Sequence, residues 1–287
     1  MNKPSISFEF FPPKTEKGSD NLIRRVKEDF LPLGPSYISI TYGAGGSSRN
    51  LTKNTIVRLK EETNLKIVSH LTCVGMSKTE LSILLDEYDE LGIHDILALR
   101  GDPPSGDSAF SPVGDGFSYA AELVEFIKKN YPHMSVGVAG FPEGHPATPN
   151  RLVELENLKR KVDCGADYIC TQLFFDNRDF YDFRERCELA DINIPIKAGI
   201  MPIVSKNNMV RIAELSLGAK IPAKLLRAVG RTESEEAAER VGIHWATHQS
   251  LDLIENGVDG IHFYTLNKSY ATLEIFRFLG IENAAGL

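Results

Sequence analysis

The sequence contains few of the features that mark secreted or metal-binding proteins. Its 287 residues include only four cysteines, which lack the CxxC spacing and the neighbouring paired histidines of zinc sites and disulfide frameworks. We therefore expect no disulfide and no metal, and we expect most of these thiols to be small buried side chains. The cysteines are Cys73, Cys164, Cys170 and Cys187.

Long apolar runs are also missing from the chain. No stretch approaches the roughly 18 residues that cross a bilayer. In the opening segment MNKPSISFEFFPP, a serine, a glutamate and a pair of prolines interrupt the chain before a signal-peptide core forms. We expect a cytoplasmic protein without a membrane partner.

Positive charge is in deficit, since 32 Lys and Arg face 39 Asp and Glu and leave a formal net charge of −7. The chain has no block of like charges and no basic stripe interleaved with aromatic residues, so nucleic acid is excluded as a partner. With 42% hydrophobic and 25% charged residues, the composition is that of an ordinary globular protein that can bury a large core.

Eight short runs rich in β-branched and aromatic residues recur along the chain, with helical patterns between them. One helix is marked by Ser77 and Glu80, which predict a capping box, and by Gly92, which predicts its end. Regular alternation of strand and helix predicts parallel strands, and eight repeats of roughly 30 residues fit a closed (β/α)8 TIM barrel better than an open doubly wound sheet. The expected strands are 5–11, 36–42, 66–73, 95–101, 135–141, 168–175, 195–201 and 260–266.

The length permits one large or two medium domains, because α/β barrels reach about 250 residues as one unit. No linker, charge shift or low-complexity tract divides the chain, so we expect a single catalytic domain over residues 1–287. Residues 205–257 have room for two or three extra helices, and the turn-rich segment 103–116 is typical of a binding loop after the fourth strand.

Polar residues recur on one parity of six expected strands, where a covered parallel sheet should be apolar on both faces. Because side chains alternate with period two, this polar set is expected to face the barrel axis, and its last members are expected at the carboxyl end, where barrel active sites lie. The pairs are Ser7 and Glu9, Ser39 and Thr41, His70 and Thr72, Arg100 and Asp102, Cys170 and Gln172, and His262 and Tyr264.

Glu9 is the first candidate for a catalytic acid. It is flanked by Phe8 and Phe10 and followed by a pair of prolines, and desolvation there favours the neutral, protonated carboxyl group. The alternative is a buried ion pair with Arg100, which favours the ionised form.

Two further patterns are weaker. On one expected helix, Glu154, Asn157 and Lys161 share a face, an arrangement that exposed helix ion pairs explain most simply. In FPEGHP, Phe141 and His145 follow the fifth strand. From this position the Phe141 ring can stack on a ligand, and the His145 imidazole can form a hydrogen bond with that ligand. The glycines of YGAGGSS follow the second strand but form no dinucleotide fingerprint.

Eight motifs occur in this order, each at an expected strand or its loop: SFEFFPPK, ITYGAGG, SHLTC, LALRGDPP, GFPEGHP, NLKRKVDCGADYICTQLFFD, AGIMPI and HFYTLN. The chain closely resembles methylenetetrahydrofolate reductase in its compact bacterial form, from Ser5 to the last helix. The resemblance implies a TIM barrel that binds FAD without a Rossmann fold, is reduced by NADH or NADPH, and converts 5,10-methylenetetrahydrofolate to 5-methyltetrahydrofolate for methionine synthesis, by ping-pong kinetics. We also expect a homo-oligomer.

The same resemblance implies roles for individual residues. Glu9 protonates the folate nitrogen N10, Asp102 stabilises the cation that forms and tunes the flavin, and Gln172, Tyr264 and Lys268 bind the substrates. For the residues on the expected helix, the resemblance implies cations that bind the flavin diphosphate instead of ion pairs at the surface. The implied FAD contacts are Thr41, Tyr42, Ala44, His70, Arg100, Gly101, Asp102, Tyr119, Ala120, Phe141, His145, Glu154, Asn157, Arg160 and Lys161.

Two positions depart from the family pattern. Lys268 stands where members often carry arginine, and Lys206 stands where some bacterial relatives have an aromatic residue that stacks on nicotinamide, which leaves the electron donor open. The alternatives are a family member that works without flavin or takes electrons from a partner protein, and a non-catalytic folate-binding or flavin-binding subunit of a larger complex.

Overall fold

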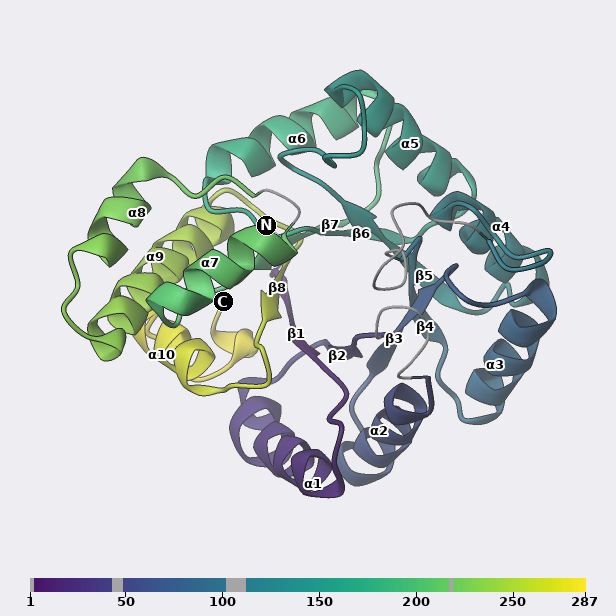
Figure 1. Ribbon diagram of the computed structural model, residues 1–287, viewed down its shortest axis with the longest axis horizontal. Helices are drawn as coiled ribbons and strands as arrows, with labels where there is room; N and C mark the ends of the chain where they lie inside the picture. Colours follow the sequence, from purple (N-terminus) through teal and green to yellow (C-terminus); the bar gives the residue numbers. More distant parts are fainter. Residues whose placement is uncertain (1–2, 43–48, 102–111, 217–218) are drawn as a thin grey trace.

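The computed structural model describes residues 3–42, 49–101, 112–216 and 219–287. Eight parallel strands pair in chain order and close into a barrel, and the helices surround it (Figure 1). The predicted (β/α)8 barrel is therefore confirmed. The strands are β1 Ser5–Phe10, β2 Tyr37–Ile40, β3 Ile67–Thr72, β4 Asp95–Leu99, β5 Ser135–Gly140, β6 Tyr168–Thr171, β7 Ile196–Ile200 and β8 Gly260–Tyr264.

Each expected strand corresponds to an observed one, but the expected runs extend one to four residues too far at their carboxyl ends. There the chain leaves the sheet to build the loops of the barrel mouth, and apolar residues such as Phe174 and Phe175 continue the pattern because they remain buried. The hydrophobic pattern therefore marks buried residues, and it continues past the last residue that pairs with a neighbouring strand.

The helices cover the outside of the barrel and add three elements between β7 and β8 (Figure 1), as residues 205–257 predict. A π-helical turn at Val26–Phe30 and a 3-10 turn at Leu31–Leu33 follow α1, and another 3-10 turn spans Ala284–Gly286. The α-helices in the described residues are α1 Glu16–Arg25, α2 Arg49–Thr63, α3 Lys78–Glu90, α4 Ala120–Asn130, α5 Arg151–Asp163, α6 Asn177–Leu189, α7 Lys206–Leu215, α8 Ala223–Gly230, α9 Glu235–Glu255 and α10 Tyr270–Phe278.

Helix α3 shows how local sequence sets these boundaries. Ser77 and Glu80 form the predicted capping box, and Gly92 adopts a φ of +66° just after the helix, a conformation that glycine reaches without steric cost. The sequence thus determines both ends of α3.

The core has two layers, one between strands and helices and one inside the barrel. In the outer layer, Phe30 packs against Phe8 and Phe10 with ring centroids 4.8 and 4.9 Å apart, and burying each ring contributes about 1.5–3 kcal/mol. Inside the barrel, Lys197 Nζ lies 4.1 and 4.3 Å from the ring centroids of Tyr37 and Tyr168. Burial lowers the pKa of this lysine to about 8.

Strand β4 corrects one expectation. Leu97 and Leu99 pack with the inner layer, whereas Ile96 and Ala98 belong to the outer layer, so Arg100 has the outward parity and follows the last paired residue. The prediction that Arg100 ends the inner face of this strand is therefore wrong. Both faces of β4 are apolar, so the sequence carries no signal of its parity.

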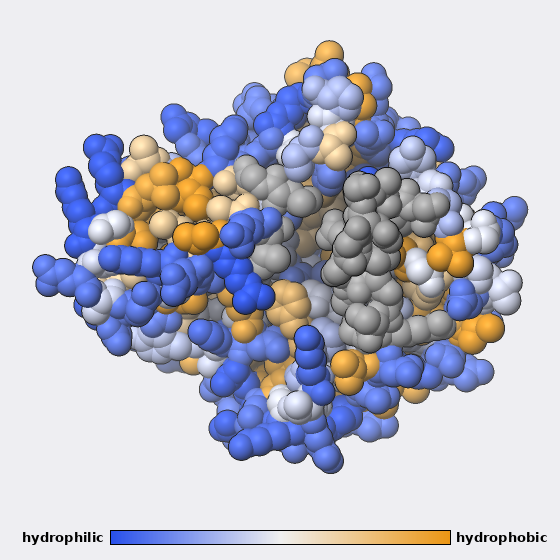
Figure 2. Space-filling model, viewed as in Figure 1, coloured by the Kyte–Doolittle hydropathy of each residue, from blue (hydrophilic) through white to orange (hydrophobic). Residues whose placement is uncertain are grey.

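The four cysteines are free thiols, as predicted. Burial raises the pKa of the Cys73, Cys170 and Cys187 thiols to about 12, which keeps them protonated. Among the described residues, no helix combines the length and the apolar character that a membrane span requires. Figure 2 shows hydrophilic residues over most of the face viewed in Figure 1.

Candidate active site

Glu9 lies near the carboxyl end of β1 and its side chain is buried, with 8% of the residue exposed. Its Oε2 lies 3.3 Å from His70 Nε2 on β3 and 3.5 Å from His262 Nε2 on β8. The predicted inward face of β1, β3 and β8 therefore brings a carboxyl group and two imidazoles together inside the barrel.

His262 is held from several sides. Its Nδ1 lies 2.8 Å from Ser7 Oγ, its Nε2 lies 3.5 Å from Ser39 Oγ, and its ring stacks on Tyr37 at a centroid distance of 5.9 Å. These contacts fix the direction of the imidazole toward Glu9. The polar parity of β8 predicts His262 on the inner face but predicts no role for it, because Glu9 lies 253 residues away in sequence.

His70 has an electrostatic environment set mainly by burial. Burial lowers the pKa of its imidazole, Glu9 opposes that shift, and His262 adds to it. Its Nε2 lies at ion-pair distance from Glu9 but has no aligned hydrogen-bond partner among the described residues. A buried polar atom without such a partner is costly, which favours a site that a ligand completes.

The chain around Glu9 is tied to the segment that follows β8. Thr265 Oγ1 donates a hydrogen bond to the Glu9 carbonyl oxygen at 2.6 Å. Asn267 pairs with both backbone groups of Phe11, accepting from its N–H at 2.8 Å and donating to its carbonyl at 2.9 Å, and the Arg25 guanidinium donates to the Asn267 carbonyl. We call the Phe11–Asn267 pair the β1–β8 latch. We did not predict this latch from the sequence, although the positive φ of 60° at Asn267 suits the residue type.

Tyr264 joins β8 to β6. Its hydroxyl donates to the Thr171 carbonyl at 2.7 Å, and the ring passes over Gly199, where a Cβ would lie 2.7 Å from Tyr264 Cε2. Burial is the largest cause that raises the pKa of this phenol, with further contributions from Cys170 and Glu9. Tyr264 is thus a neutral hydroxyl in a fixed position.

Two hollows lie beside these residues. One, of about 250 Å³, is lined by Gln172, Phe141 and neighbouring residues. The other, of about 350 Å³, is lined by Tyr264, Lys268 and Glu239 among others. Burial raises the pKa of Glu239 and the charge of Lys268 opposes that shift. Two of the predicted substrate-binding residues, Tyr264 and Lys268, therefore share one hollow, while Gln172 lines the other.

The α5 side of the mouth carries the predicted cationic residues. Lys161 Nζ donates to the Ala139 carbonyl at 2.5 Å, and burial lowers the pKa of its ammonium to about 8, against the opposing charge of Glu154. Glu154 is buried and accepts from Thr148 Oγ1 at 2.7 Å. Its partners lie in the loop before α5, so it is not part of an exposed helix ion pair. Asn157 and Arg160 are exposed on the same helix.

The remaining predicted residues lie around the same end of the barrel. Phe141 and His145 contact each other edge to face at 4.9 Å. Thr41 and Tyr42 are buried just past β2, Arg100 and Gly101 follow β4 half-buried, and Tyr119 and Ala120 begin α4. Ala44 and Asp102, with the glycines of YGAGGSS and residues 103–111, lie outside the described residues.

Lys206 lies at the first turn of α7. Its Nζ donates to the Thr232 carbonyl at 2.7 Å, and its backbone N–H donates to Glu235 Oε2 at 3.1 Å. The ammonium therefore contacts the segment between α8 and α9.

Comparison with known proteins gives this site a family. The 5,10-methylenetetrahydrofolate reductases of Salmonella typhimurium and Escherichia coli are 36% and 35% identical to the chain over 279 residues, covering 97% of it and 91% of theirs. "Methylenetetrahydrofolate reductase (NADH) 1" of Arabidopsis thaliana is 39% identical over 292 residues, covering 98% of this chain and 49% of that protein. The chain thus spans about half the length of such plant relatives.

A solved structure supports the fold. A Clostridium thermocellum protein that binds two copies of 5-methyl-5,6,7,8-tetrahydrofolic acid superposes with a TM-score of 0.67 at 15% identity, over 97% of this chain and 96% of that one. The family profile described as Methylenetetrahydrofolate reductase matches residues 1–280. Because this match covers nearly the whole sequence and the relatives agree with it, the chain belongs to the methylenetetrahydrofolate reductase family.

Proposed function

We propose that this chain reduces 5,10-methylenetetrahydrofolate to 5-methyltetrahydrofolate, with FAD bound at the barrel mouth and NADH or NADPH as electron donor, in one-carbon metabolism and methionine synthesis. The observation that carries the proposal is the buried Glu9 carboxyl group, which lies between two imidazoles at the carboxyl end of a barrel of this family. Proton donation by a positioned carboxyl group is the chemistry that opening the folate ring requires.

Glu9 is the proton donor to N10 of the folate. Once the proton has left, the carboxylate keeps two imidazole neighbours, His70 and His262, and the latter is in turn held by the Ser7 hydroxyl. This chain of contacts supports His262 as the residue that stabilises the ionised carboxylate, which takes its next proton from solvent. Asp102 is the proposed second carboxylate, which stabilises the iminium cation of the opened folate.

The residues at the mouth fit a flavin dinucleotide. Within the described part of the chain, the buried His70 Nε2 has no aligned partner, and Lys161 and Arg160 supply cations for a diphosphate beside the exposed Asn157. When bound, the flavin would supply hydride transfer from the nicotinamide to the folate carbon. Thr41, Tyr42, Ala44, Arg100, Gly101, Tyr119, Ala120, Phe141, His145 and Glu154 complete the proposed contacts.

The substrates are held by Gln172, Tyr264 and Lys268. Lys268 is exposed beside the hollow that Tyr264 lines, and a folate tail carries carboxylates that an ammonium attracts as a point charge. Gln172 serves both substrates in turn, because folate and nicotinamide use the same flavin face. This alternation leads to ping-pong kinetics.

The test is the absorption spectrum of the purified protein, recorded anaerobically before and after NADH or NADPH, and again after methylenetetrahydrofolate. We expect a flavin spectrum that a nicotinamide bleaches and the folate restores. A folded, colourless protein that FAD does not reconstitute would support the flavin-independent alternative. Bound flavin that neither donor reduces would support electron supply by a partner protein or a non-catalytic subunit.

A further inference from the structure

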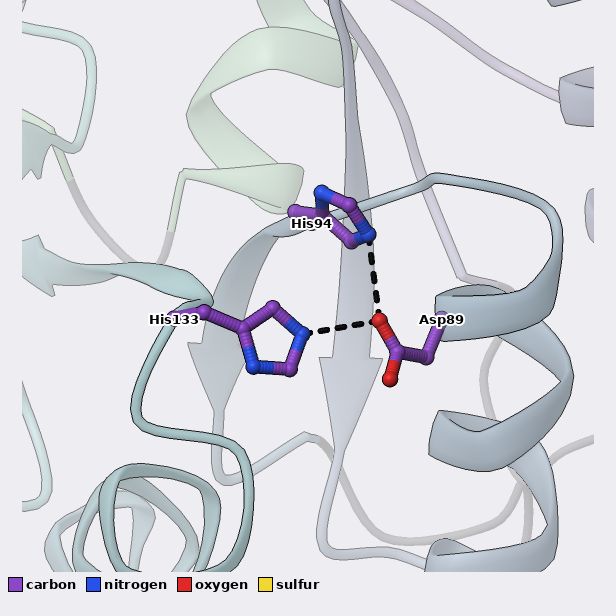
Figure 3. Close-up of side chains that lie close together, drawn as sticks. All are labelled: Asp89, His94 and His133. Carbon is purple, nitrogen blue, oxygen red and sulfur yellow. Dashed lines mark hydrogen bonds and ion pairs between the residues drawn. The ribbon is translucent and has the colours of Figure 1, made fainter.

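Three metal-ligating side chains meet at the end of the barrel opposite Glu9. Asp89 lies in the last turn of α3, His94 immediately precedes β4, and His133 lies two residues before the start of β5. Figure 3 shows the imidazoles of His94 and His133 both pointing toward the same carboxylate oxygen of Asp89. The cluster lies at the amino ends of parallel strands, so it belongs to no part of the proposed catalytic site.

The distances are close to those of a metal site. Asp89 Oδ1 lies 2.7 Å from His133 Nε2 and 3.1 Å from His94 Nε2, and all three ligand atoms lie within 4.8 Å of one another. Tetrahedral zinc, with bonds of about 2.0–2.2 Å, holds neighbouring ligand atoms about 3.3 Å apart. Small side-chain rotations therefore suffice to admit the ion.

The backbone that carries these side chains is held in place by hydrogen bonds. Gly92 N–H donates to the Asp89 carbonyl and Ser135 N–H donates to the His94 carbonyl, both at 2.8 Å. The first bond closes the end of α3, and the second joins the starts of β4 and β5. A site on such fixed elements loses little conformational entropy when it binds an ion.

Exposure leaves room for a solvent ligand. The side chains of Asp89, His94 and His133 are 41%, 45% and 47% exposed, so water reaches the cluster. Two neutral imidazoles and one carboxylate are ligands that zinc prefers among divalent ions, and a water molecule completes four-coordination.

We propose that Asp89 Oδ1, His94 Nε2 and His133 Nε2 bind one divalent transition-metal ion, of which zinc is the best match. The ion clamps the end of α3 to the starts of β4 and β5. Its role is structural, because the cluster is at the opposite end of the barrel from Glu9. This inference is independent of the proposed function.

Zinc titration by calorimetry, on full-length protein stripped of metal with a chelator, tests the site. The matched control is His244→Gln/His248→Gln, which removes the other exposed histidine pair, whose Nε2 atoms lie 3.3 Å apart on α9. We expect one equivalent of zinc in the wild type and the control. His94→Gln and His133→Gln should each weaken binding by at least about tenfold.

Two further measurements do not rely on the heat of binding. Cobalt added in place of zinc should produce the visible absorption of a low-coordinate ion in the wild type and the control, and zinc should raise the melting temperature of both. His94→Gln/His133→Gln should show neither effect. The proposal is overturned if the wild type binds no zinc, if all variants bind it equally, or if only His244→Gln/His248→Gln loses it.

Discussion

At the scale of single residues, Glu9 combines burial with two imidazole neighbours. The histidines hold its carboxyl group beside the mouth, and the hydroxyl of Ser7 fixes one of them. Only the folate half of the proposed reaction consumes a proton from an acid, so the two halves separate the catalytic role of Glu9 from a structural one.

Glu9→Gln should slow the folate half-reaction by roughly 10²–10⁴-fold, the usual contribution of a general acid. Reduction of the flavin by nicotinamide should stay within a few-fold of wild type. Stopped-flow absorbance measures each half separately. Equal losses in both halves would mean that Glu9 serves only to hold its two histidines in place.

Lys161 gives a pH dependence whose sign is set by its lowered pKa of about 8. Below that pH the ammonium is charged and, in the proposed function, attracts the flavin diphosphate; above it the charge is lost. The FAD dissociation constant should therefore rise as the pH increases above about 8, by roughly tenfold, since a hydrogen bond to a charged group contributes about 1.5–3 kcal/mol.

The matched variants for this test are Lys161→Met and Arg160→Met. Lys161→Met should bind FAD weakly, and its FAD dissociation constant should not change around pH 8. Arg160→Met should bind FAD weakly at every pH, but its dissociation constant should still rise above pH 8, because the lost guanidinium is protonated throughout. FAD fluorescence quenching measures both constants. A wild-type constant that is flat from pH 7 to 10 would contradict the assignment of Lys161 to the diphosphate.

At the scale of elements, the β1–β8 latch and the first turn of α7 carry contacts that local sequence does not reveal. The latch adds two hydrogen bonds between the exits of the first and last strands, beside the β1–β8 pairing that closes the barrel. Asn267 also occupies a left-handed conformation, so its side chain and its backbone contribute separately.

Asn267→Gly should lower the free energy of unfolding by about 2 kcal/mol, because two hydrogen bonds of about 1 kcal/mol each are lost. Asn267→Ala should lose about 1 kcal/mol more, since alanine resists a positive φ. Urea unfolding measures the difference. If the two variants are equally stable, the backbone conformation makes no contribution.

The backbone N–H of Lys206 contacts the start of α9, and its ammonium contacts the segment before that helix. Lys206→Met should therefore change flavin reduction by NADH and by NADPH by the same factor. Lys206→Phe, which supplies an aromatic ring, is the companion variant. A change in the NADH to NADPH ratio in Lys206→Met would place the ammonium at the nucleotide 2′-phosphate instead.

At the scale of the whole molecule, the interior of the barrel separates the proposed catalytic site at one end from the proposed metal site at the other. Its inner layer, where Lys197 lies over Tyr37 and Tyr168, fills the space between the mouth and the amino end. In the proposed function, the substrates therefore reach the flavin from the mouth, where we expect them to bind in turn.

Steady-state kinetics should accordingly give parallel double-reciprocal lines when the nicotinamide and the folate are varied together. The physical reason is that the first product must leave before the second substrate enters. Intersecting lines would mean that both substrates bind at once, on separate surfaces of the flavin. Light scattering on the same preparation tests the expected homo-oligomer.

The sequence by itself determined the elements and the candidate acid. Strand and helix periods, the capping box at Ser77 and the polar parity that ends in Glu9 are all local patterns, because side-chain direction and helix ends depend on residues a few positions apart. The eight strands and the three helices before β8 follow from such patterns.

Only the tertiary structure decided which distant side chains meet. Closing the barrel pairs β1 with β8, and that pairing brings His262 to Glu9 and Asn267 to Phe11. The sequence could not show which alternate residues of β4 face the barrel interior, because both faces of this strand are apolar. Asp89, His94 and His133 meet because parallel strands begin at one end of the barrel, a consequence of topology that no local spacing encodes.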